Sequence, residues 1–309
     1  MKILIIGLGS IARKHIQAIF LIKPESKIFA LRKLSNDKID GVENIFSIDA
    51  IKEKLDFVLI SNPTQLHALT ILDSLKLNCP IFIEKPALSD LISAELIRNK
   101  INKSNLITYV SFNLRFHPAI VFLKNYLDKT NLRINEVNVY CGSYLPDWRG
   151  KVNFRKVYSA NKNMGGGVHL DLIHEIDYSI WLFGQPKEVN SFSTSTSSLE
   201  IDSVDYAQYN LIYEKFVLNI KLNYFRRDSK REIEIVAENE TLLCDLQNCV
   251  IKNLVNDTII YKKKYNILET YIAQMNYFID IVNKGRQPMN SFEESLNVLK
   301  IALNDKFTK

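Results

Sequence analysis

The feature that most limits the possible folds is a glycine-rich turn directly after the first apolar run, Lys2–Ile6. The turn has the pattern G-x-G-x-x-A and leads into a helical pattern. The first glycine of such a turn permits a tight bend, the second lets a pyrophosphate approach the backbone, and the helix N-terminus supplies amide donors. A tight turn without a ligand is the alternative. We expect a dinucleotide here, in contact with Gly7, Gly9, Ser10, Ile11 and Ala12.

The following residues, up to about 118, alternate short apolar runs with helical patterns. Such alternation is typical of βαβ units and predicts a parallel sheet. The expected strands are Lys2–Ile6, Ser26–Leu31, Phe57–Ser61, Ile81–Glu84 and Ile107–Ser111. The expected helices are Ser10–Leu21, Gln65–Leu75 and Ser89–Lys100.

Beyond residue 118 the chain changes character, because a helical pattern at Pro118–Lys129 is followed by long β-type runs. In Phe216–Leu222 apolar and polar residues alternate, so one face of that strand must be covered by helices or by a second subunit. Ser291 and Glu294 have the spacing of a capping box and predict a final helix at about 291–306. The other expected strands are Glu136–Tyr144, Glu188–Ser195, Ala207–Tyr213, Phe216–Tyr224, Glu232–Ala237 and Thr241–Leu246.

Composition narrows the class of protein. The 309 residues carry a formal net charge of +6 that is dispersed along the chain, so nucleic acid is not an expected partner. The four cysteines form no C-x-x-C pair, so neither a metal site nor a disulfide framework is expected. The N-terminal apolar run is too short for a signal peptide or a membrane span. We therefore expect a cytoplasmic protein that does not bind a membrane.

The end of the second strand bears on the identity of the dinucleotide. Folds that bind NAD usually place an acid there for the ribose hydroxyls, whereas this chain has Arg32 and Lys33. A cation attracts the 2′-phosphate that an acid would repel, so NADP is favoured over NAD. Asp37 lies close in sequence and keeps open the alternative of a solvated charge pair with the adenosine end held differently.

Two further strand ends should meet at the same carboxyl edge of the sheet. One delivers Ser61, Asn62 and Pro63, followed by His67, and the other ends in Glu84 and Lys85. A lysine beside a positively charged nicotinamide suits a proton donor or a group that stabilises an alkoxide. The alternative for Glu84 and Lys85 is a surface ion pair.

The segment Gly165–Tyr178 (GGGVHLDLIHEIDY) carries the second cluster of reactive side chains. Three glycines lead into a helical pattern that places Asp171, His174, Glu175 and Tyr178 on one face, while apolar residues occupy the other. A carboxylate that orients an imidazole is a usual arrangement for proton transfer near neutral pH. A surface helix that happens to contain a histidine is the alternative.

In this order and at these intervals, GLGSIA, SNPTQLH, EKP, NLRFHP and the glycine–Asp–His segment resemble the glucose–fructose oxidoreductase, inositol dehydrogenase and rhizopine-catabolism (Gfo/Idh/MocA) family. The resemblance spans the chain. It implies an NAD(P)-binding Rossmann domain at 1–118 and a substrate-binding and oligomerisation domain at 119–309. The second domain would carry a large, open, mainly antiparallel sheet. Whether the final helix packs back on the Rossmann domain is left open.

The resemblance also assigns roles to residues. Lys85 matches the family's EKP lysine, which lies near the nicotinamide, and Glu84 would border the cofactor with it. His174 matches the histidine of proton transfer, and Asp171 matches its acid. In many members that acid and histidine are four positions apart, whereas here they are three positions apart, so Asp171 could instead hold a substrate hydroxyl. The implied arrangement has His174 take the hydroxyl proton, Asp171 stabilise the imidazolium and Lys85 stabilise the oxyanion.

Substrate residues are expected in the loop before the glycines and at the domain junction. Five basic residues lie between positions 147 and 164, interleaved with aromatic ones. Aromatic rings stack on sugars and arginine binds phosphate or carboxylate, so an anionic sugar is one interpretation and a merely solvated loop is the other. The expected substrate contacts are Arg115, Trp148, Arg149, Tyr158 and His174.

The resemblance implies an oxidoreductase that moves a hydride between NADP or NAD and a hydroxyl or carbonyl carbon of a sugar derivative. A nucleotide sugar, phosphosugar or uronate would suit the basic loop. It also implies a homodimer or homotetramer formed through the second sheet. Two alternatives remain: a glycosidase that oxidises its sugar transiently with tightly held NAD, and a non-catalytic dinucleotide sensor.

Overall fold

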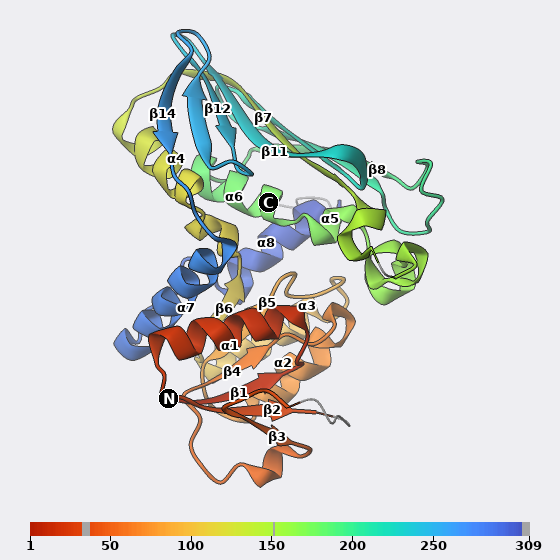
Figure 1. The fold of residues 1–309 in the computed structure, drawn as a ribbon, viewed down its shortest axis with the longest axis vertical. Helices are drawn as coiled ribbons and strands as arrows, with labels where there is room; N and C mark the ends of the chain where they lie inside the picture. The colour runs from red at the N-terminus through yellow and green to blue at the C-terminus, as the bar shows by residue number, and fades with distance from the viewer. Residues whose placement is uncertain (33–37, 151, 305–309) are drawn as a thin grey trace. The chain divides into compact units, whose positions relative to one another are not determined.

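The computed structural model describes residues 1–32, 38–150 and 152–304, which divide into two compact units (Figure 1). The first unit comprises Met1–Asn113 and Asn266–Asn297, and the second comprises Leu114–Tyr265 and the residues from Val298 onward. Each unit contains one sheet, the first of six strands and the second of eight.

The first sheet is parallel throughout, with the strand order β3-β2-β1-β4-β5-β6. This is the doubly wound order of dinucleotide-binding folds, in which the crevice for a ligand opens where the order reverses, between β1 and β4. The parallel sheet predicted from the sequence is confirmed. The strands are β1 (Lys2–Ile6), β2 (Lys27–Leu31), β3 (Val42–Ile45), β4 (Phe57–Ile60), β5 (Ile81–Glu84) and β6 (Thr108–Ser111).

Four helices of the first unit are α1 (Ser10–Ile22), α2 (His67–Leu75), α3 (Ala94–Ser104) and α7 (Ile267–Lys284). Helix α7 follows the second sheet in sequence, yet Met275 and Phe278 pack into the same core as Ile3 and Phe57 of the first sheet. A capping box between Asn266 and Glu269 fixes where α7 begins. The core of this unit is therefore completed by a segment from near the C-terminal end of the chain.

The second sheet has the order β14-β13-β12-β11-β7-β10-β9-β8. Among the described strands, only β7 and β10 pair in parallel, so the mainly antiparallel sheet is confirmed. Its strands are β7 (Ile134–Tyr144), β8 (Glu188–Thr194), β9 (Tyr206–Ile212), β10 (Val217–Asn223), β11 (Phe225–Ala237), β12 (Thr241–Asp245), β13 (Val250–Asn253) and β14 (Thr258–Lys262).

Helices α4 (Pro118–Lys129), α5 (Val168–Asp171) and α6 (His174–Phe183) lie along one face of the second sheet (Figure 1). The alternation predicted in β10 places Leu218, Ile220 and Leu222 on the covered face, where all three are fully buried. The hydrophobic face of an antiparallel sheet needs such a cover, while its other face can remain polar.

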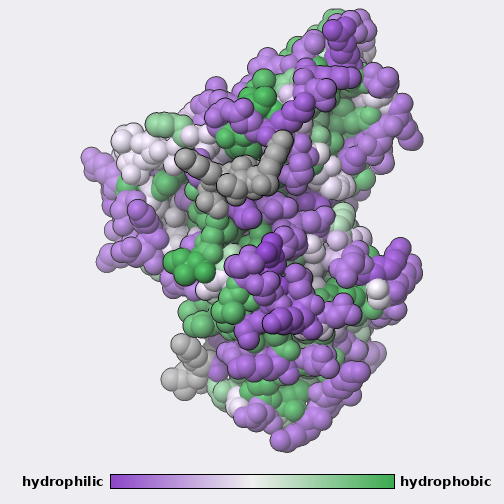
Figure 2. Space-filling model, turned by 180° about the vertical axis from the view of Figure 1, so that it is seen from behind, coloured by the Kyte–Doolittle hydropathy of each residue, from purple (hydrophilic) through white to green (hydrophobic). Residues whose placement is uncertain are grey.

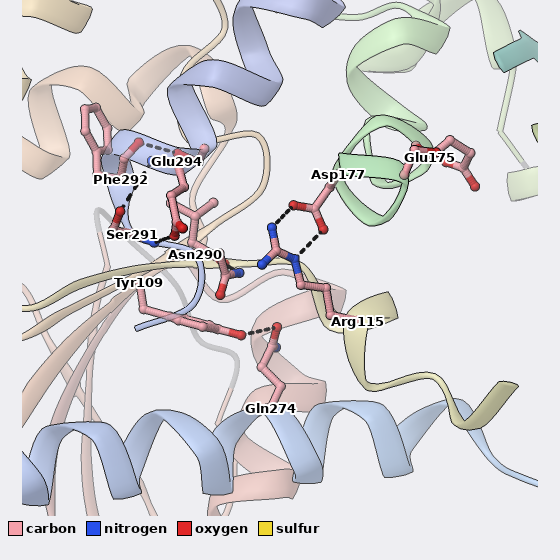
Figure 3. A network of polar contacts seen from close by, with 12 residues as sticks. Tyr109, Arg115, Glu175, Asp177, Gln274, Asn290, Ser291, Phe292 and Glu294 are labelled. Carbon is pink, nitrogen blue, oxygen red and sulfur yellow. Dashed lines mark hydrogen bonds and ion pairs between the residues drawn. The ribbon is translucent and has the colours of Figure 1, made fainter. Parts of the chain in front are cut away.

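Some boundaries differ from those expected. The helix expected at Ser89–Lys100 is α3, which begins only at Ala94, because the Asp90 side chain accepts from the Ile92 amide and forms a turn before it. Strands β3, β13 and β14 and helix α7 were not predicted. The capping box of Ser291 and Glu294 is confirmed at the start of α8 (Phe292–Ala302) (Figure 3). Residues 305 and 306 of the expected final helix lie outside the described residues.

Figure 2 shows one face of the molecule, on which hydrophobic patches are interspersed among hydrophilic surface. Cys79, Cys141, Cys244 and Cys249 are buried free thiols. Within the described ranges, no helix is both long and apolar enough to cross a membrane, and no three histidine, cysteine or acidic side chains are grouped as metal ligands would be.

Candidate active site

The turn after β1 brings the ends of two strands into contact. Gly7 has a φ of +94°, and a side chain there would overlap the backbone of Asn62 at the end of β4. The Ser61 hydroxyl donates to the Gly7 carbonyl at 2.9 Å and joins the same two strand ends. Only glycine satisfies both the positive φ and the close approach, as the sequence pattern indicated.

The start of α1 presents backbone amides. Gly9 is the N-cap residue, and among the described residues no atom lies within 4 Å of where its Cβ would stand. Ala12 is buried in the core, and Ile11 packs partly against it. Their predicted cofactor contacts, like that of Ser10, would therefore come from the main chain, where the amides and the helix dipole favour an anion.

A cavity of about 790 Å³ opens beside this turn. It is lined at the ends of three strands by Gly7 of the β1 turn, by Arg32 after β2 and by Asn62 and Pro63 after β4. The Nη1 atom of Arg32 is buried and makes no hydrogen bond to any residue that the structure describes. A buried guanidinium nitrogen of this kind suits an anionic ligand group. Lys33 and Asp37, which the sequence also placed here, lie outside the described residues.

His67 joins two loops at this edge of the sheet. Its ring is buried, with Nε2 at 2.9 Å from the Asn62 carbonyl oxygen and Nδ1 at 3.1 Å from that of Pro86. Burial lowers the pKa of His67, although the surrounding carbonyl groups oppose this effect. The side chain is thus occupied by main-chain carbonyls, and its predicted cofactor contact stays a prediction.

Glu84, the last residue of β5, turns its carboxylate inward instead of toward solvent. It accepts from Ser111 at 2.8 Å and lies 2.5 Å from Nε2 of His15, a residue of α1 that the sequence analysis passed over. The alternative of a surface pair between Glu84 and Lys85 is therefore wrong, because Glu84 is only 8% exposed. The G-x-G-x-x-A-x-x-H spacing could have indicated His15, since that residue lies on the buried side of α1.

The expectation of one continuous helix with an open polar face around Asp171 is wrong. A turn at Leu172 and Ile173 separates α5 from α6, and the residues of α6 are buried on nearly all sides. Glu175 is fully buried and forms an ion pair with Arg231 of β11 at 2.7 Å. The helical period alone could not reveal a partner 56 residues away.

Arg115 is likewise engaged within the second unit. Its Nε and Nη2 atoms donate to the two carboxylate oxygens of Asp177 at 2.9 and 2.6 Å (Figure 3). The guanidinium also lies 5.8 Å from the ring of Trp181, and both ion-pair partners are buried. Such a bidentate pair is a strong structural contact. The substrate contact expected for Arg115 stays a prediction.

Asp171 is held by two phenols. Tyr158 donates to one carboxylate oxygen at 2.7 Å, and Tyr224, which follows β10, donates to the other at 2.5 Å. Burial and, after it, the Asp171 charge raise the pKa of Tyr158, so this phenol stays protonated and keeps donating. Both oxygens of Asp171 thus have a tyrosine partner, and its pairing with His174 stays a prediction.

The loop residues expected to contact substrate surround these phenols. Trp148 packs edge-to-face on Tyr224 with ring centroids 5.3 Å apart, and its indole N–H donates to Ser143. The Arg149 guanidinium lies 5.9 Å from the ring centre of Tyr158. Trp148 and Tyr158 are 40% and 39% exposed, so both offer aromatic surface to a ligand. The structure therefore brings three predicted substrate residues together around Asp171.

Two histidines lie close to Asp171 in sequence. His174 is the first residue of α6 and is 8% exposed. His169, on α5, lies against Gly167, and burial lowers its pKa to about 4 although the Asp171 charge opposes this. A neutral, partly buried His169 packed against Gly167 fits a packing role. Of the two imidazoles, His174 therefore remains the candidate for proton transfer.

The fold defines a class of protein: one with a Rossmann-type nucleotide domain and a second domain built on a mainly antiparallel sheet. Residues 1–112 match the model of an oxidoreductase family with an NAD-binding Rossmann fold, and residues 133–243 match the GFO/IDH/MocA C-terminal domain. The chain belongs to the GFO/IDH/MocA family.

Relatives of known name are distant. The chain is 21% identical to myo-inositol 2-dehydrogenase of Thermotoga maritima over 95% of its own length and 92% of that protein. It is 27% identical to levoglucosan dehydrogenase of Pseudarthrobacter phenanthrenivorans over 43% of its length, which covers 34% of that protein. It spans 63% of the Bacillus subtilis protein YteT, to which it is 24% identical over 85% of its own length. Two of these three curated relatives are thus matched over less than two thirds of their length.

Solved structures share the fold. Levoglucosan dehydrogenase in complex with NADH and levoglucosan superposes with a TM-score of 0.85 at 16% identity, over 98% of this chain and 95% of that one. UDP-N-acetylglucosamine 3-dehydrogenase from Acidithiobacillus ferrooxidans superposes with a TM-score of 0.78 at 20% identity, over 98% and 96%.

Proposed function

We propose that this chain transfers a hydride between a nicotinamide cofactor and a hydroxyl or carbonyl carbon of a sugar or cyclitol. The observation that carries the proposal is the cavity at the ends of β1, β2 and β4, with Gly7 pressed against Asn62 and the amides of α1 beside it. These groups fit the pyrophosphate and adenosine end of a dinucleotide. When bound, the nicotinamide accepts or supplies the hydride.

In the proposed reaction, the chain's own residues handle the proton. His174 takes the hydroxyl proton during oxidation and returns it during reduction. Lys85 stabilises the negative charge that develops on the substrate oxygen. Asp171, held by Tyr158 and Tyr224, carries a fixed negative charge that stabilises the imidazolium of His174 or accepts from a neighbouring substrate hydroxyl.

The surroundings of Asp171 favour a ring-shaped, polar substrate. Trp148 and Tyr158 offer aromatic surface for a sugar face, and Arg149 adds a cation that suits a phosphate or carboxylate. We propose an anionic sugar derivative, with neutral sugars and cyclitols as competitors. The named relatives act on inositols, levoglucosan and UDP-N-acetylglucosamine, which span both possibilities.

For the cofactor we propose NADP in preference to NAD. Arg32 lines the cavity after β2 with a buried guanidinium nitrogen that is available to a 2′-phosphate. Acidic residues at this strand end favour NAD, because they bond to the ribose hydroxyls and repel the phosphate.

Fluorescence titration with NADPH and NADH tests the cofactor assignment. Arg32→Ala should weaken NADPH binding about tenfold, the loss of roughly one charge-assisted hydrogen bond, while NADH binding changes little. Equal or tighter binding of NADH by the unmodified protein would contradict the proposal.

A substrate panel tests the reaction. Myo-inositol, levoglucosan, glucuronate, glucose 6-phosphate and UDP-N-acetylglucosamine are each supplied with both oxidised cofactors while nicotinamide absorbance is followed. Faster turnover of the anionic members would support the proposed substrate class. Cofactor that stays bound through purification, with aglycone release and no net change in absorbance, would instead indicate the redox-elimination glycosidase.

We also propose that the chain acts in the cytoplasm as a homodimer or homotetramer formed through the uncovered face of the second sheet. Phe192 on β8 and Phe225 on β11 are 62% and 37% exposed, so apolar side chains remain outside the core. Light scattering on the protein as it leaves a size-exclusion column measures the mass of the assembly. The mass of one chain would contradict this proposal.

A further inference from the structure

The main chain at Lys85 is tied to a buried carboxylate. Glu84 Oε2 accepts from the backbone N–H of Lys85 at 3.1 Å, while Oε1 accepts from the Ser111 hydroxyl and lies 2.5 Å from His15 Nε2. These partners come from β6 and from α1, the helix whose first amides border the proposed cofactor site. One carboxylate thus joins the start of Lys85 to two separate elements.

His15 is itself held firmly. The ring is fully buried and meets Phe82 and Tyr271 edge-to-face, with centroid distances of 4.9 and 5.1 Å. Burial raises the pKa of Glu84, but the contact with His15, the hydrogen bond from Ser111 and the charge of Lys85 together outweigh it and bring that pKa below its usual value. An ionised carboxylate can only accept hydrogen bonds, so Nε2 of His15 carries the proton.

The main chain after Lys85 is also fixed. The Pro86 carbonyl lies 3.1 Å from His67 Nδ1, whose ring reaches across to the Asn62 carbonyl after β4. Lys85 therefore stands between two anchored residues. Its amine is carried on a four-carbon stem, so the position of the main chain limits where that amine can reach.

We propose that His15 is a positioning residue that acts through Glu84 on Lys85. This inference depends on the proposed function, which makes Lys85 the residue that stabilises charge on the substrate oxygen. His15 is buried beneath the strand end and acts without touching cofactor or substrate. A displacement of about 1 Å in a catalytic group can cost about 10²-fold in rate, so a weakened anchor has a measurable effect.

The first experiment compares His15→Leu with His15→Gln. Leucine removes the donor, whereas the glutamine amide can still donate to Glu84. With the panel substrate that turns over fastest, we expect His15→Leu to lower kcat about 10–10²-fold, with NADPH affinity retained, and His15→Gln to recover most of the loss. A parallel loss of NADPH affinity, or equal losses of kcat in the two variants, would overturn the proposal.

His117→Gln is the matched control. His117 is also a buried histidine, but the residues that it bonds to are different: it contacts the Leu246 carbonyl and caps α4 by accepting from the Ala119 amide. We expect that variant to lose stability and to keep its kcat per folded molecule. A loss of kcat equal to that of His15→Leu would mean that any buried histidine has this effect, and would overturn the proposal.

A double-mutant cycle then tests whether His15 affects turnover through Lys85. In a Lys85→Ala background, His15→Leu should cause no further loss of kcat, because the group that it positions is absent. The same fold loss in both backgrounds would overturn the proposal. If Lys85→Ala itself keeps normal turnover, the proposed function of Lys85 fails, which is a different result.

An NMR measurement, which does not depend on turnover, tests the proposal in variants that have little activity. In protein labelled with ¹⁵N-lysine, the backbone amide of Lys85 is identified by its loss in Lys85→Arg. We expect its proton to resonate downfield through the bond to Glu84, to move in His15→Leu and Glu84→Gln, and to stay near its place in His15→Gln. An unmoved resonance in Glu84→Gln, or in a folded His15→Leu, would overturn the proposal.

Discussion

The turn after β1 and the cluster around Asp171 are built in different ways. At the turn, the groups offered to a ligand are backbone amides, and Gly7 meets Asn62 because β1 and β4 are neighbours that end at the same sheet edge. Around Asp171, two phenols that are 13 and 53 residues distant hold one carboxylate. A backbone site follows from a local pattern, whereas a side-chain cluster depends on partners that are far apart in sequence.

Charge in the second unit shows the same dependence. The sequence predicts Glu175 on an exposed polar face, but Arg231 pairs with it in the interior, as Arg115 does with Asp177. Removing one partner from a buried pair leaves an uncompensated charge, which costs far more than the pair contributes. Substitutions at the nucleotide turn and in the buried clusters of the second unit should therefore impair the protein for different physical reasons.

Loss of the proposed proton acceptor should have the largest effect. His174→Ala is expected to lower turnover by about 10²–10⁴-fold, because general acid–base catalysis contributes on that scale. Affinity for NADPH, measured by fluorescence titration, should stay unchanged. Near-normal turnover would contradict the assignment of His174 as the proton acceptor. It would also weaken the proposal that the cluster around Asp171 takes part in the reaction.

Breaking the ion pair of Arg115 should cost stability. Arg115→Met is expected to lower the free energy of unfolding by about 3–5 kcal/mol, because it leaves Asp177 buried and unpaired. Urea denaturation followed by circular dichroism measures the loss. Arg133→Met, which removes an exposed pair with Glu238, is the control and should cost roughly 0–1 kcal/mol. Similar losses in the two variants would contradict the distinction.

The two glycines of the nucleotide turn should respond differently. Gly7→Ala is expected to cost about 1–3 kcal/mol of stability and to abolish tight NADPH binding, because of its φ of +94° and the overlap with Asn62. Gly9→Ala has open space and ordinary backbone angles, so it should keep the fold and weaken only NADPH binding. Thermal unfolding with and without NADPH separates the cases, and an equally destabilised Gly9→Ala would refute this interpretation.

Acidification should destabilise the second unit through the buried His117. Burial, aided by the Arg231 charge and opposed by the bond to Leu246, lowers the pKa of His117 from 6.5 to about 4 in the folded state. The unfolded state therefore binds the extra proton first, and stability falls as the pH drops from about 6.5 to 4, by up to about 3 kcal/mol. Urea denaturation at pH 7.5 and 5.0 measures the fall, which His117→Gln should reduce. An unchanged pH dependence in that variant would contradict this cause.

Much of the first unit could be predicted from sequence because its information is local. The ends of β1, β4 and β5 lie within one residue of the expected positions, since apolar runs bounded by glycine, proline or polar residues define short buried strands. Strand β3 and helix α7 were missed. β3 is a four-residue edge strand, and Val42 and Asn44 are only partly buried, so its apolar signal is weak.

The candidate site residues likewise divide into those whose arrangement was predicted from local sequence and those whose partners were not. The glycines of the turn are at the positions that the pattern required, and Trp148, Arg149 and Tyr158 do gather beside Asp171. The engagement of Arg115, the break between α5 and α6 and the anchoring of Glu84 by His15 were not predictable. Each depends on which distant side chain occupies the remaining space in a core.

The sequence by itself determined the parallel sheet with its nucleotide turn and the resemblance to the family, which in turn implied the mainly antiparallel second sheet. Periodicity and glycine spacing act through nearest neighbours along the chain and need no distant partner. Only the tertiary structure decided that α7 completes the first core, that Tyr158 and Tyr224 share Asp171 and that Glu175 is buried against Arg231. Those arrangements depend on burial, which makes an unpaired polar group costly and thereby selects its partner.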